Sequence, residues 1–250
     1  MAVEKKALEK KRALVTGGSR GIGAAIVLRL AREGADVAFT YVSRPEQAEA
    51  TAKAARELGV RAIALRADAA DADAVVAAVE RAAEELSAID ILVNNAGVAT
   101  MAPVDDFRLA DFDHLVAVNL RAVFVATQAA VRQMPSGGRI VTIGSCNALR
   151  MPFAGGAVYA MSKAGLVGLV KGLARDLAPP GITVNNVQPG PVDTEMNPAA
   201  GAFADSLRAL TAIPRYASAD EIASMVAYLV GSEAGYVTGA SLTIDGGFTA

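Results

Sequence analysis

A chain of 250 residues is long enough for one large α/β domain, and its hydrophobic fraction of 53% excludes a disordered or fibrous protein. A net charge of -2 argues against a nucleic-acid partner or binding to a membrane surface. Cys146 is the single cysteine, which excludes an internal disulfide and favours a cytoplasmic location; with one histidine, no His/Cys metal site is expected.

The beginning of the chain is polar. Residues 1–11 are rich in Lys and Glu, so we expect a short solvated lead-in before a single domain over residues 12–250. No apolar run approaches the ~20 residues of a membrane span, so no membrane partner is expected.

The first predicted unit is a strand, a glycine turn and a helix. Ala13–Val15 is an apolar run without polar alternation, as in a strand buried on both faces. Thr16–Gly23 follows with the spacing Gly-x-x-x-Gly-x-Gly, and apolar residues at helical spacing continue to a closing Gly34. Such glycines let the backbone approach a dinucleotide pyrophosphate at the helix N-terminus, although a purely structural turn fits the glycines alone equally well.

The second predicted strand, Asp36–Tyr41, bears on the choice of cofactor. An NAD-binding fold carries an acid near its end for the ribose 2′-hydroxyl. Residues 41–44, Tyr-Val-Ser-Arg, contain no acid. Arg20 and Arg44 can instead bind a 2′-phosphate through their planar guanidinium groups, though two solvated surface arginines are the alternative. We therefore predict NADP in preference to NAD.

The middle of the chain continues the alternation of strands and helices with short connections. Four such units predict a parallel, doubly wound sheet of the α/β class. Ligands of these sheets lie beyond the carboxyl ends of the strands, which is where Asp68 and the tetrad Asn94-Asn95-Ala96-Gly97 fall. The predicted elements are a helix over 46–58 behind Pro45, a strand over 60–65, a helix from the cap Asp71 to about residue 86, and a strand over 89–93.

The second half begins with a long helix predicted over 109–133. Asn119 is a polar residue on an apolar stretch of it, and a buried amide needs hydrogen-bond partners. His114 lies in no evident polar cluster, and we interpret it as a surface or packing residue. The remaining predictions are a strand over 139–143 ending at Gly144-Ser145, a helix reaching 177, a strand over 182–187 ending at Gln188–Pro191, a mobile substrate lid around 191–213, a helix over 220–230 and a strand over 241–244.

Tyr159 and Lys163 lie four positions apart, and hence on one face of the predicted helix. A phenol with an ammonium group one turn away is an acid/base device if nearby cations lower its pKa from about 10. The pair alone is more typical of a packed tyrosine beside a solvated lysine. The motifs at the strand ends favour the acid/base interpretation.

Taken in order, these motifs resemble the short-chain dehydrogenase/reductase family over nearly the whole chain. The family pattern is Thr-Gly-x-x-x-Gly-x-Gly, Asp, Asn-Asn-Ala-Gly, Asn, Ser, Tyr-x-x-x-Lys and Pro-Gly. The resemblance implies a single Rossmann-like domain with a parallel sheet of about seven strands, a nicotinamide cofactor and a homotetramer. The matching residues are Thr16–Gly23, Asp68, Asn94–Gly97, Asn119, Ser145, Tyr159 with Lys163, and Pro189-Gly190.

The resemblance also implies a role for each catalytic residue. Tyr159 is the acid/base at the substrate oxygen, and Ser145 polarises that oxygen. Lys163 binds the nicotinamide ribose and lowers the pKa of the tyrosine, and Asn119 holds a water in the proton relay. Asp68 and the Asn95–Gly97 turn face the adenosine half, whereas Val192 and Thr194 hold the carboxamide. The expected cofactor-binding residues are Gly17, Ser19, Arg20, Gly21, Ile22, Gly23, Tyr41, Ser43, Arg44, Asp68, Asn95, Ala96, Gly97, Tyr159, Lys163, Pro189, Gly190, Val192 and Thr194.

One departure concerns Ser145, which precedes Tyr159 by fourteen positions, one more than is common in the family. We attribute the difference to a longer loop over 149–153, which affects the substrate wall. Ser162 is the nearby alternative to Ser145, but it lies on a different helix face from Tyr159. The expected substrate pocket consists of Cys146, Asn147, Met151, Phe153, Met196 and Phe203.

The predicted function is an NADP-dependent oxidoreductase that transfers a hydride between the nicotinamide and a ketone or, in reverse, a secondary alcohol, with Tyr159 as the acid/base. The similar 3-oxoacyl-carrier-protein reductases carry basic residues just before the strands that correspond to 139–143 and 182–187 here, where an acidic carrier is held by charge. The corresponding residues here are Ser136-Gly137 and Pro179-Pro180, so a free small or hydrophobic ketone is favoured. Carrier docking on Arg132 or Arg139, with reduction in fatty-acid synthesis, stays open, as does a non-catalytic nucleotide-binding regulator.

Overall fold

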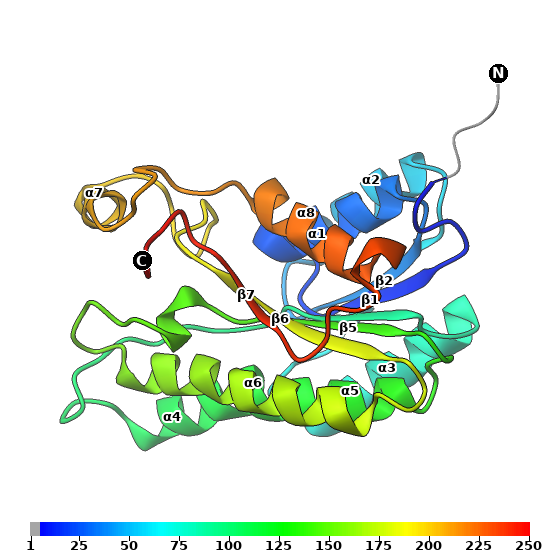
Figure 1. Ribbon diagram of the computed structural model, residues 1–250, viewed down its shortest axis with the longest axis horizontal. Coiled ribbons are helices and arrows are strands. Elements are labelled where there is room, and N and C mark those ends of the chain that lie inside the picture. The colour runs from blue at the N-terminus through cyan, green and yellow to red at the C-terminus, as the bar shows by residue number, and fades with distance from the viewer. Residues whose placement is uncertain (1–5) are drawn as a thin grey trace.

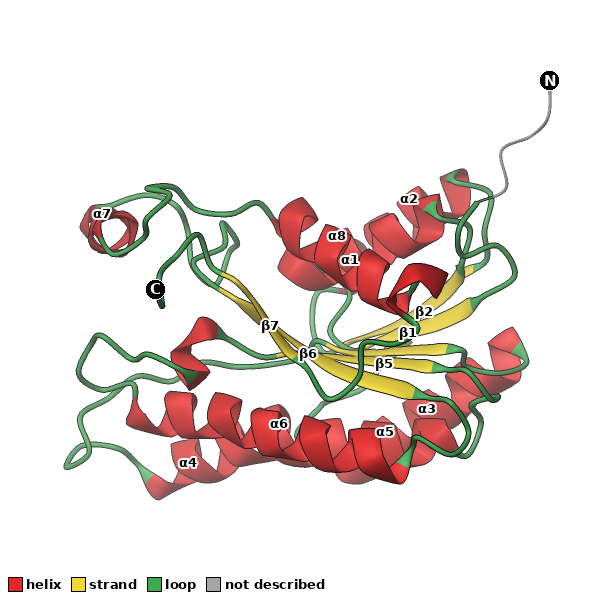
Figure 2. Ribbon diagram, in the orientation of Figure 1, coloured by secondary structure: helices red, strands yellow, loops and turns green. Residues whose placement is uncertain are grey.

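The computed structural model describes residues 6–250. Seven parallel strands form one sheet in the order β3-β2-β1-β4-β5-β6-β7. Helices cover both faces, with α1, α2 and α8 on one side and α3 to α6 on the other (Figures 1 and 2). The predicted Rossmann-like, doubly wound fold is therefore confirmed. The strands are β1 (Arg12–Val15), β2 (Asp36–Tyr41), β3 (Ala62–Arg66), β4 (Ile91–Asn94), β5 (Arg139–Ile143), β6 (Thr183–Pro189) and β7 (Ser241–Ile244).

The helices follow the strands in alternation, as the hydrophobic periodicity predicts. Asp71 caps α3 by accepting hydrogen bonds from the backbone N–H groups of Asp73 and Ala74. Ser218 and Glu221 form a capping box at α8. The helices are α1 (Gly21–Arg32), α2 (Pro45–Glu57), α3 (Ala72–Leu86), α4 (Leu109–Val116), α5 (Ala122–Val131), α6 (Ala157–Asp176), α7 (Ala202–Ala209) and α8 (Ala219–Val230), with short helices η1 (Ala117–Arg121), η2 (Cys146–Ala148) and η3 (Ser232–Ala234).

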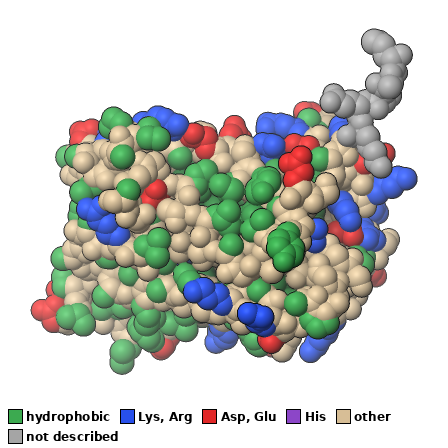
Figure 3. All heavy atoms as spheres, in the orientation of Figure 1, with side chains coloured by type: hydrophobic (Ala, Val, Ile, Leu, Met, Phe, Trp, Pro, Cys, Tyr) green, Lys and Arg blue, Asp and Glu red, His purple; other side chains and the backbone are tan. Residues whose placement is uncertain are grey.

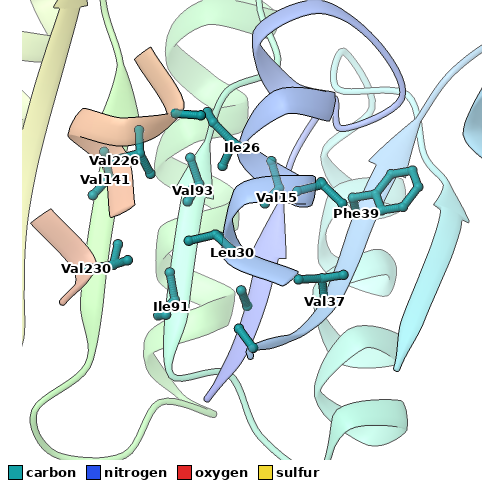
Figure 4. Close-up of a cluster of buried hydrophobic side chains, with 14 of the residues drawn as sticks. Val15, Ile26, Leu30, Val37, Phe39, Ile91, Val93, Val141, Val226 and Val230 are labelled. Carbon is teal, nitrogen blue, oxygen red and sulfur yellow. The ribbon is translucent and has the colours of Figure 1, made fainter. Parts of the chain in front are cut away.

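The core lies on both sides of the sheet because successive strand residues point to opposite faces. Val15 packs with α1 and α8 in one cluster, whereas its neighbour Leu14 packs with α3 and α5 in the other. Figure 4 shows the first cluster, where Ile26 and Leu30 of α1 lie over Val15 and Val93. Burial on both faces explains why the strands read as continuous apolar runs.

Sheet topology places the ligand edge between β1 and β4. The chain fills β1, β2 and β3 outward in one direction and then returns to β4 on the other side of β1. The connections after β1 and β4 therefore diverge from the same edge. In open parallel sheets this switch point is where nucleotides bind.

The long helix predicted over 109–133 is divided. It consists of α4, the π-helical segment η1 and α5, with Asn119 at the centre of η1. A π-helical turn adds a residue to the turn, and such turns are frequent at functional sites. The predicted helix is thus present, but its regular spacing is interrupted at Asn119.

The lead-in differs from its prediction, and the segment predicted as a lid contains a helix. Leu8 is buried, and its N–H donates to the carbonyl of Glu33 at 2.8 Å, so the segment from residue 6 to 11 is not fully solvated. Residues 1–5 of the predicted lead-in lie outside the described residues. The lid around 191–213 contains α7, which lies near the C-terminus (Figure 1). Leu207 of α7 belongs to the same buried cluster as Phe248.

Two helical stretches have the length and composition of a membrane span. They are residues 109–131, with mean hydropathy 1.4, and α6, with mean hydropathy 1.2. Charged residues such as Arg121 and Lys163 interrupt both stretches, so neither is a continuous apolar run of that length. Both lie along one face of the sheet (Figure 2), where apolar side chains of α5 and α6 join the core.

Candidate active site

A cleft of ≈ 750 Å³ runs along the carboxyl ends of the strands. The predicted cofactor-binding residues all line it, although they come from segments between Gly17 and Thr194. Ser145, Cys146, Asn147, Phe153, Met196 and Phe203 line the same cleft. The structure therefore brings together residues that the sequence connects only through their places at strand ends.

The glycine turn after β1 is tightly wound. Gly17 has a φ of 67°, in the left-handed region, and a Cβ on Gly23 would lie 2.1 Å from the carbonyl oxygen of Gly17. Asn95 fastens the turn, since its Nδ2 donates to the carbonyls of Thr16 and Gly17 at 3.0 Å. Arg20, the N-cap of α1, makes no side-chain cap, so it leaves the N–H groups of the first helical turn available to an anion.

Arg20 and Arg44 converge at the far end of the cleft. Their terminal nitrogens donate to one carboxylate oxygen of Glu195, at 2.8 Å and 2.6 Å. These hydrogen bonds lower the pKa of Glu195 below its usual value. Arg44 has a φ of 60°, a conformation that costs an arginine about 1 kcal/mol, so the backbone is strained where it presents this guanidinium. Sequence reasoning identified the two arginines but missed Glu195.

Tyr159 and Ser145 meet at the other end. Tyr159 lies in the first turn of α6, and Ser145 follows β5 as the N-cap of η2. Burial raises the pKa of Tyr159 above its usual value, and the hydrogen bond with Ser145 lowers it only in part. The phenol is therefore protonated at neutral pH.

Lys163 is buried behind Tyr159, with 6% of its surface exposed. Its Nζ donates to the carbonyl of Ile143 at 3.0 Å and lies 5.8 Å from the centre of the Tyr159 ring. Burial lowers the pKa of Lys163 to about 8. Burial is the largest influence on the pKa of Tyr159, while the Lys163 ammonium group donates to a backbone carbonyl. The lowering of the Tyr159 pKa by Lys163 stays a prediction.

Asn119 joins three segments beneath the site. Its Oδ1 accepts from the N–H of Val98 at 2.9 Å, and its Nδ2 donates to the Val98 carbonyl at 3.0 Å and to Ser162 Oγ at 3.1 Å. Ser162 Oγ in turn donates to the carbonyl of Tyr159 at 2.8 Å. Ser162 is thus a buried support for α6, and the structure places Ser145, not Ser162, on the cleft wall.

The substrate end of the cleft is largely apolar. Phe153 and Phe203 face each other with ring centres 5.6 Å apart. Burial and the nearby Asp245 raise the pKa of Cys146 to about 12, so its thiol is protonated and contributes a small apolar wall. Met151 was expected to line the cleft but is not among its lining residues; Asn147 Nδ2 donates to its Sδ at 3.3 Å.

Several lining residues were not predicted. His114, interpreted as a surface or packing residue, is exposed and lines the cleft from α4. Gln47, Met101 and Phe248 also line it. These residues belong to no strand-end motif, so local sequence carries no signal that would distinguish them.

Together the fold and the cleft define a dinucleotide-dependent oxidoreductase. A family model described as enoyl-(acyl carrier protein) reductase matches residues 17–249. A short-chain dehydrogenase/reductase from Serratia marcescens is 61% identical and superimposes with a TM-score of 0.97, covering 98% of this chain and 100% of that chain. A short-chain dehydrogenase from Burkholderia cenocepacia J2315, solved in complex with NADP, is 56% identical, with the same TM-score and coverage.

A third relative is named for nucleotide binding and not for an oxidoreductase activity. The cyclic-di-GMP-binding biofilm dispersal mediator protein of Escherichia coli K12 is 49% identical over 96% of this chain and 98% of its own length. The chain belongs to the short-chain dehydrogenase/reductase family, as its motifs indicated. It is an NAD(P)-dependent dehydrogenase/reductase of that family.

Proposed function

We propose that this protein is an NADP(H)-dependent carbonyl reductase that acts on a ketone or, in reverse, a secondary alcohol. The observation that carries the proposal is the single cleft with an arginine pair at one end and Tyr159, Ser145 and Lys163 at the other. Arg20 and Arg44 would hold the 2′-phosphate of a bound dinucleotide, and Tyr159 and Lys163 would lie beside its nicotinamide end. The relative solved with NADP supports the same cofactor for this chain.

The residues of the cleft fit NADP by their donor chemistry. The first turn of α1 offers backbone N–H groups to the pyrophosphate, and Arg20 and Arg44 offer guanidinium groups to the 2′-phosphate. Thr194 and Val192 line the wall where the carboxamide would be held. When bound, the reduced nicotinamide supplies the hydride.

The protein supplies the proton and the stabilisation of charge. Addition of hydride to a carbonyl carbon leaves an alkoxide-like oxygen, which needs preorganised hydrogen bonds and a proton. Tyr159 donates the proton, and the Ser145 hydroxyl donates a hydrogen bond to the same oxygen. The raised pKa of Tyr159 suits this direction, because the donor is protonated at neutral pH. Lys163, with a pKa of about 8, can return a proton near neutrality.

The apolar end of the cleft favours free hydrophobic ketones over carrier-bound acyl chains. Phe153, Phe203 and Met196 form the apolar wall. Arg139, a candidate for carrier docking, donates to the backbone carbonyls of Gly137 and Gly138 at 2.7 Å and 3.0 Å. A side chain held in this way is poorly placed to steer an acidic carrier.

A substrate panel tests the proposal. The kcat/KM with NADPH is compared for simple cyclic and aryl ketones, a 3-oxoacyl carrier protein and its free thioester analogue. We expect the free ketones to be the better substrates. A strong preference for the carrier-bound substrate, lost as salt is raised, would instead identify reduction in fatty-acid synthesis.

A second function, that of a nucleotide-binding regulator, is favoured by the name of the E. coli relative. The arginine pair can bind a phosphodiester of a cyclic dinucleotide as well as a 2′-phosphate. The test is calorimetric titration with cyclic di-GMP in the presence and absence of NADPH. Competitive binding, together with no turnover of any carbonyl in the panel, would favour the regulator over the reductase.

Assembly as a homotetramer is the arrangement that we propose, and one helix face supports it. A Cβ on Gly168 or Gly172 of α6 would meet nothing within 4 Å, and Met161 and Phe124 are exposed. Figure 3 shows hydrophobic side chains gathered along the lower left of this view, over α4 and the start of α6. Small and apolar residues on one face fit a two-fold contact between helices. Light scattering at micromolar concentration tests whether the protein forms a tetramer.

The cytoplasmic location stays a prediction.

A further inference from the structure

Glu195 lies at the tip of a tight turn above the cofactor cleft. The turn is closed at its base by the backbone, where Asn197 N–H donates to the Thr194 carbonyl at 3.1 Å. The Glu195 side chain leaves the turn and reaches groups that are distant in sequence. Its partners are Arg20 in the glycine turn, Arg44 before α2, and Gln47 of α2, whose Nε2 donates to Oε1 at 3.3 Å.

The Glu195 carboxylate occupies the position between the two arginines that a bound anion would take. Both guanidinium groups donate to the same oxygen, Oε2, at 2.8 Å and 2.6 Å. Two arginines that converge on one oxygen are arranged as they would be around a phosphate oxygen. Of the two positive charges that a 2′-phosphate would meet, the carboxylate offsets one.

The same turn also lies over the start of α1. The Cγ2 atom of Thr194 is 3.4 Å from the position that a Cβ on Gly21 would occupy. Gly21 is the first residue of α1, the end of the helix that faces the pyrophosphate. Glu195 is therefore held over the cleft by a turn that itself contacts the cofactor-binding wall.

We propose that Glu195 is a specificity-determining residue that competes with the 2′-phosphate of NADP for Arg20 and Arg44. The inference rests on the NADP cofactor proposed above. A cofactor with a 2′-phosphate must draw at least one arginine away from the carboxylate, whereas a cofactor with a free 2′-hydroxyl need not. Glu195 thus reduces the preference for NADP over NAD that the two arginines alone would produce.

Binding of adenosine fragments isolates this effect from catalysis. The probes are 2′,5′-ADP, which carries the 2′-phosphate, and 5′-AMP, which lacks it, each titrated calorimetrically into the full-length protein. In Glu195→Gln we expect 2′,5′-ADP to bind roughly fivefold more tightly, since exposed ion pairs contribute modestly, while 5′-AMP binds as before. The gain should shrink as salt screens the charges.

The control is Glu49→Gln, which removes a carboxylate that pairs with Arg56 on α2 and does not line the cleft. This variant should bind both probes as the unmodified protein does. Unchanged or weaker binding of 2′,5′-ADP in Glu195→Gln would overturn the proposal; weaker binding would show that Glu195 fastens the cofactor instead of competing with it. Comparable tightening of 5′-AMP would also overturn it.

The variant Arg44→Ala distinguishes failure of the proposed role of Glu195 from failure of the proposed NADP cofactor. If the unmodified protein and Arg44→Ala both bind 2′,5′-ADP no better than 5′-AMP, the 2′-phosphate site itself is absent. If Arg44→Ala alone loses the discrimination, the site is present and the result with Glu195→Gln decides the role of the carboxylate.

Discussion

The two ends of the cleft both depend on cations, but the protein buries them very differently. At the far end, the side chains of Arg20, Arg44 and Glu195 are 47%, 52% and 47% exposed. At the catalytic end, the cation is Lys163, which is 6% exposed. Water and salt weaken the electrostatic interactions between exposed charges. Burial strengthens the interactions between charged groups and shifts their pKa values. In the proposed function, exposed charges therefore select the cofactor, and buried groups carry the proton transfer.

The largest effect should come from the buried end. Tyr159→Phe removes the proton donor and leaves the ring in place, so kcat should fall at least ~100-fold while the Kd for NADPH changes little. Tyr228→Phe, at an exposed tyrosine on α8, is the matched control and should retain full activity. Retention of most activity by Tyr159→Phe in steady-state assays would refute the mechanism.

Burial of Lys163 should also appear in stability. Its pKa in the folded protein, about 8, is below its usual value of 10.5, so between these pH values the unfolded chain binds more protons than the folded one. The stability of the unmodified protein should therefore rise with pH across this window. Lys163→Met, which does not titrate, should be the more stable protein below pH 8, by on the order of 2 kcal/mol, and should lose this advantage as the pH approaches about 10.5.

Denaturant unfolding at several pH values measures this difference. Lys171→Met is the control, because Lys171 is an exposed lysine of the same helix and should show no such dependence. A stability difference between the unmodified protein and Lys163→Met that is independent of pH would show that Lys163 is not desolvated in the folded state.

The sequence predicts the elements of the fold well because each strand carries its own signal. The strands Asp36–Tyr41, Arg139–Ile143 and Ser241–Ile244 have the predicted limits, since turn residues bound each apolar run. The π-helical turn at Asn119 could not be predicted from the apolar pattern, and the hydrogen-bond partners of the Asn119 side chain, Val98 and Ser162, come near it only on folding. Leu8 is a similar case, since its burial depends on α1.

The same limit applies to the site. The motif residues are recognisable because each lies at a strand end, where the sheet topology brings them together. Glu195 belongs to no motif, and its contact with Arg44 spans 151 positions. His114 lines the cleft from a helix whose local pattern indicates an ordinary surface position. Contacts between exposed side chains of distant segments are set by the tertiary fold, and local sequence does not encode them.

At the exposed end, Arg44→Asp should change the choice of cofactor without disabling the chemistry. The substitution replaces a donor to the 2′-phosphate with a repelling carboxylate, so the ratio of kcat/KM for NADPH to that for NADH should fall roughly tenfold. Arg132→Asp, at an exposed arginine that does not line the cleft, should leave the ratio unchanged. An equal fall of both kcat/KM values in Arg44→Asp would indicate damage to the fold instead of altered specificity.

The smallest effect, and the most direct test of the difference between the two ends, is that of salt. Raising the sodium chloride concentration from about 0.1 M to about 1 M shortens the Debye length from about 10 Å to about 3 Å. The exposed arginines should then attract the 2′-phosphate less, and the KM for NADPH should rise roughly threefold. The kcat at saturating NADPH should stay constant, because screening does not reach Lys163 and Tyr159 in the buried end.

The KM for NADH, which lacks the 2′-phosphate, is the control and should change less than that for NADPH. A parallel loss of kcat with both cofactors would mean that the catalytic charges are as accessible to salt as the arginine pair, and the two ends would then not differ in the way that their burial indicates.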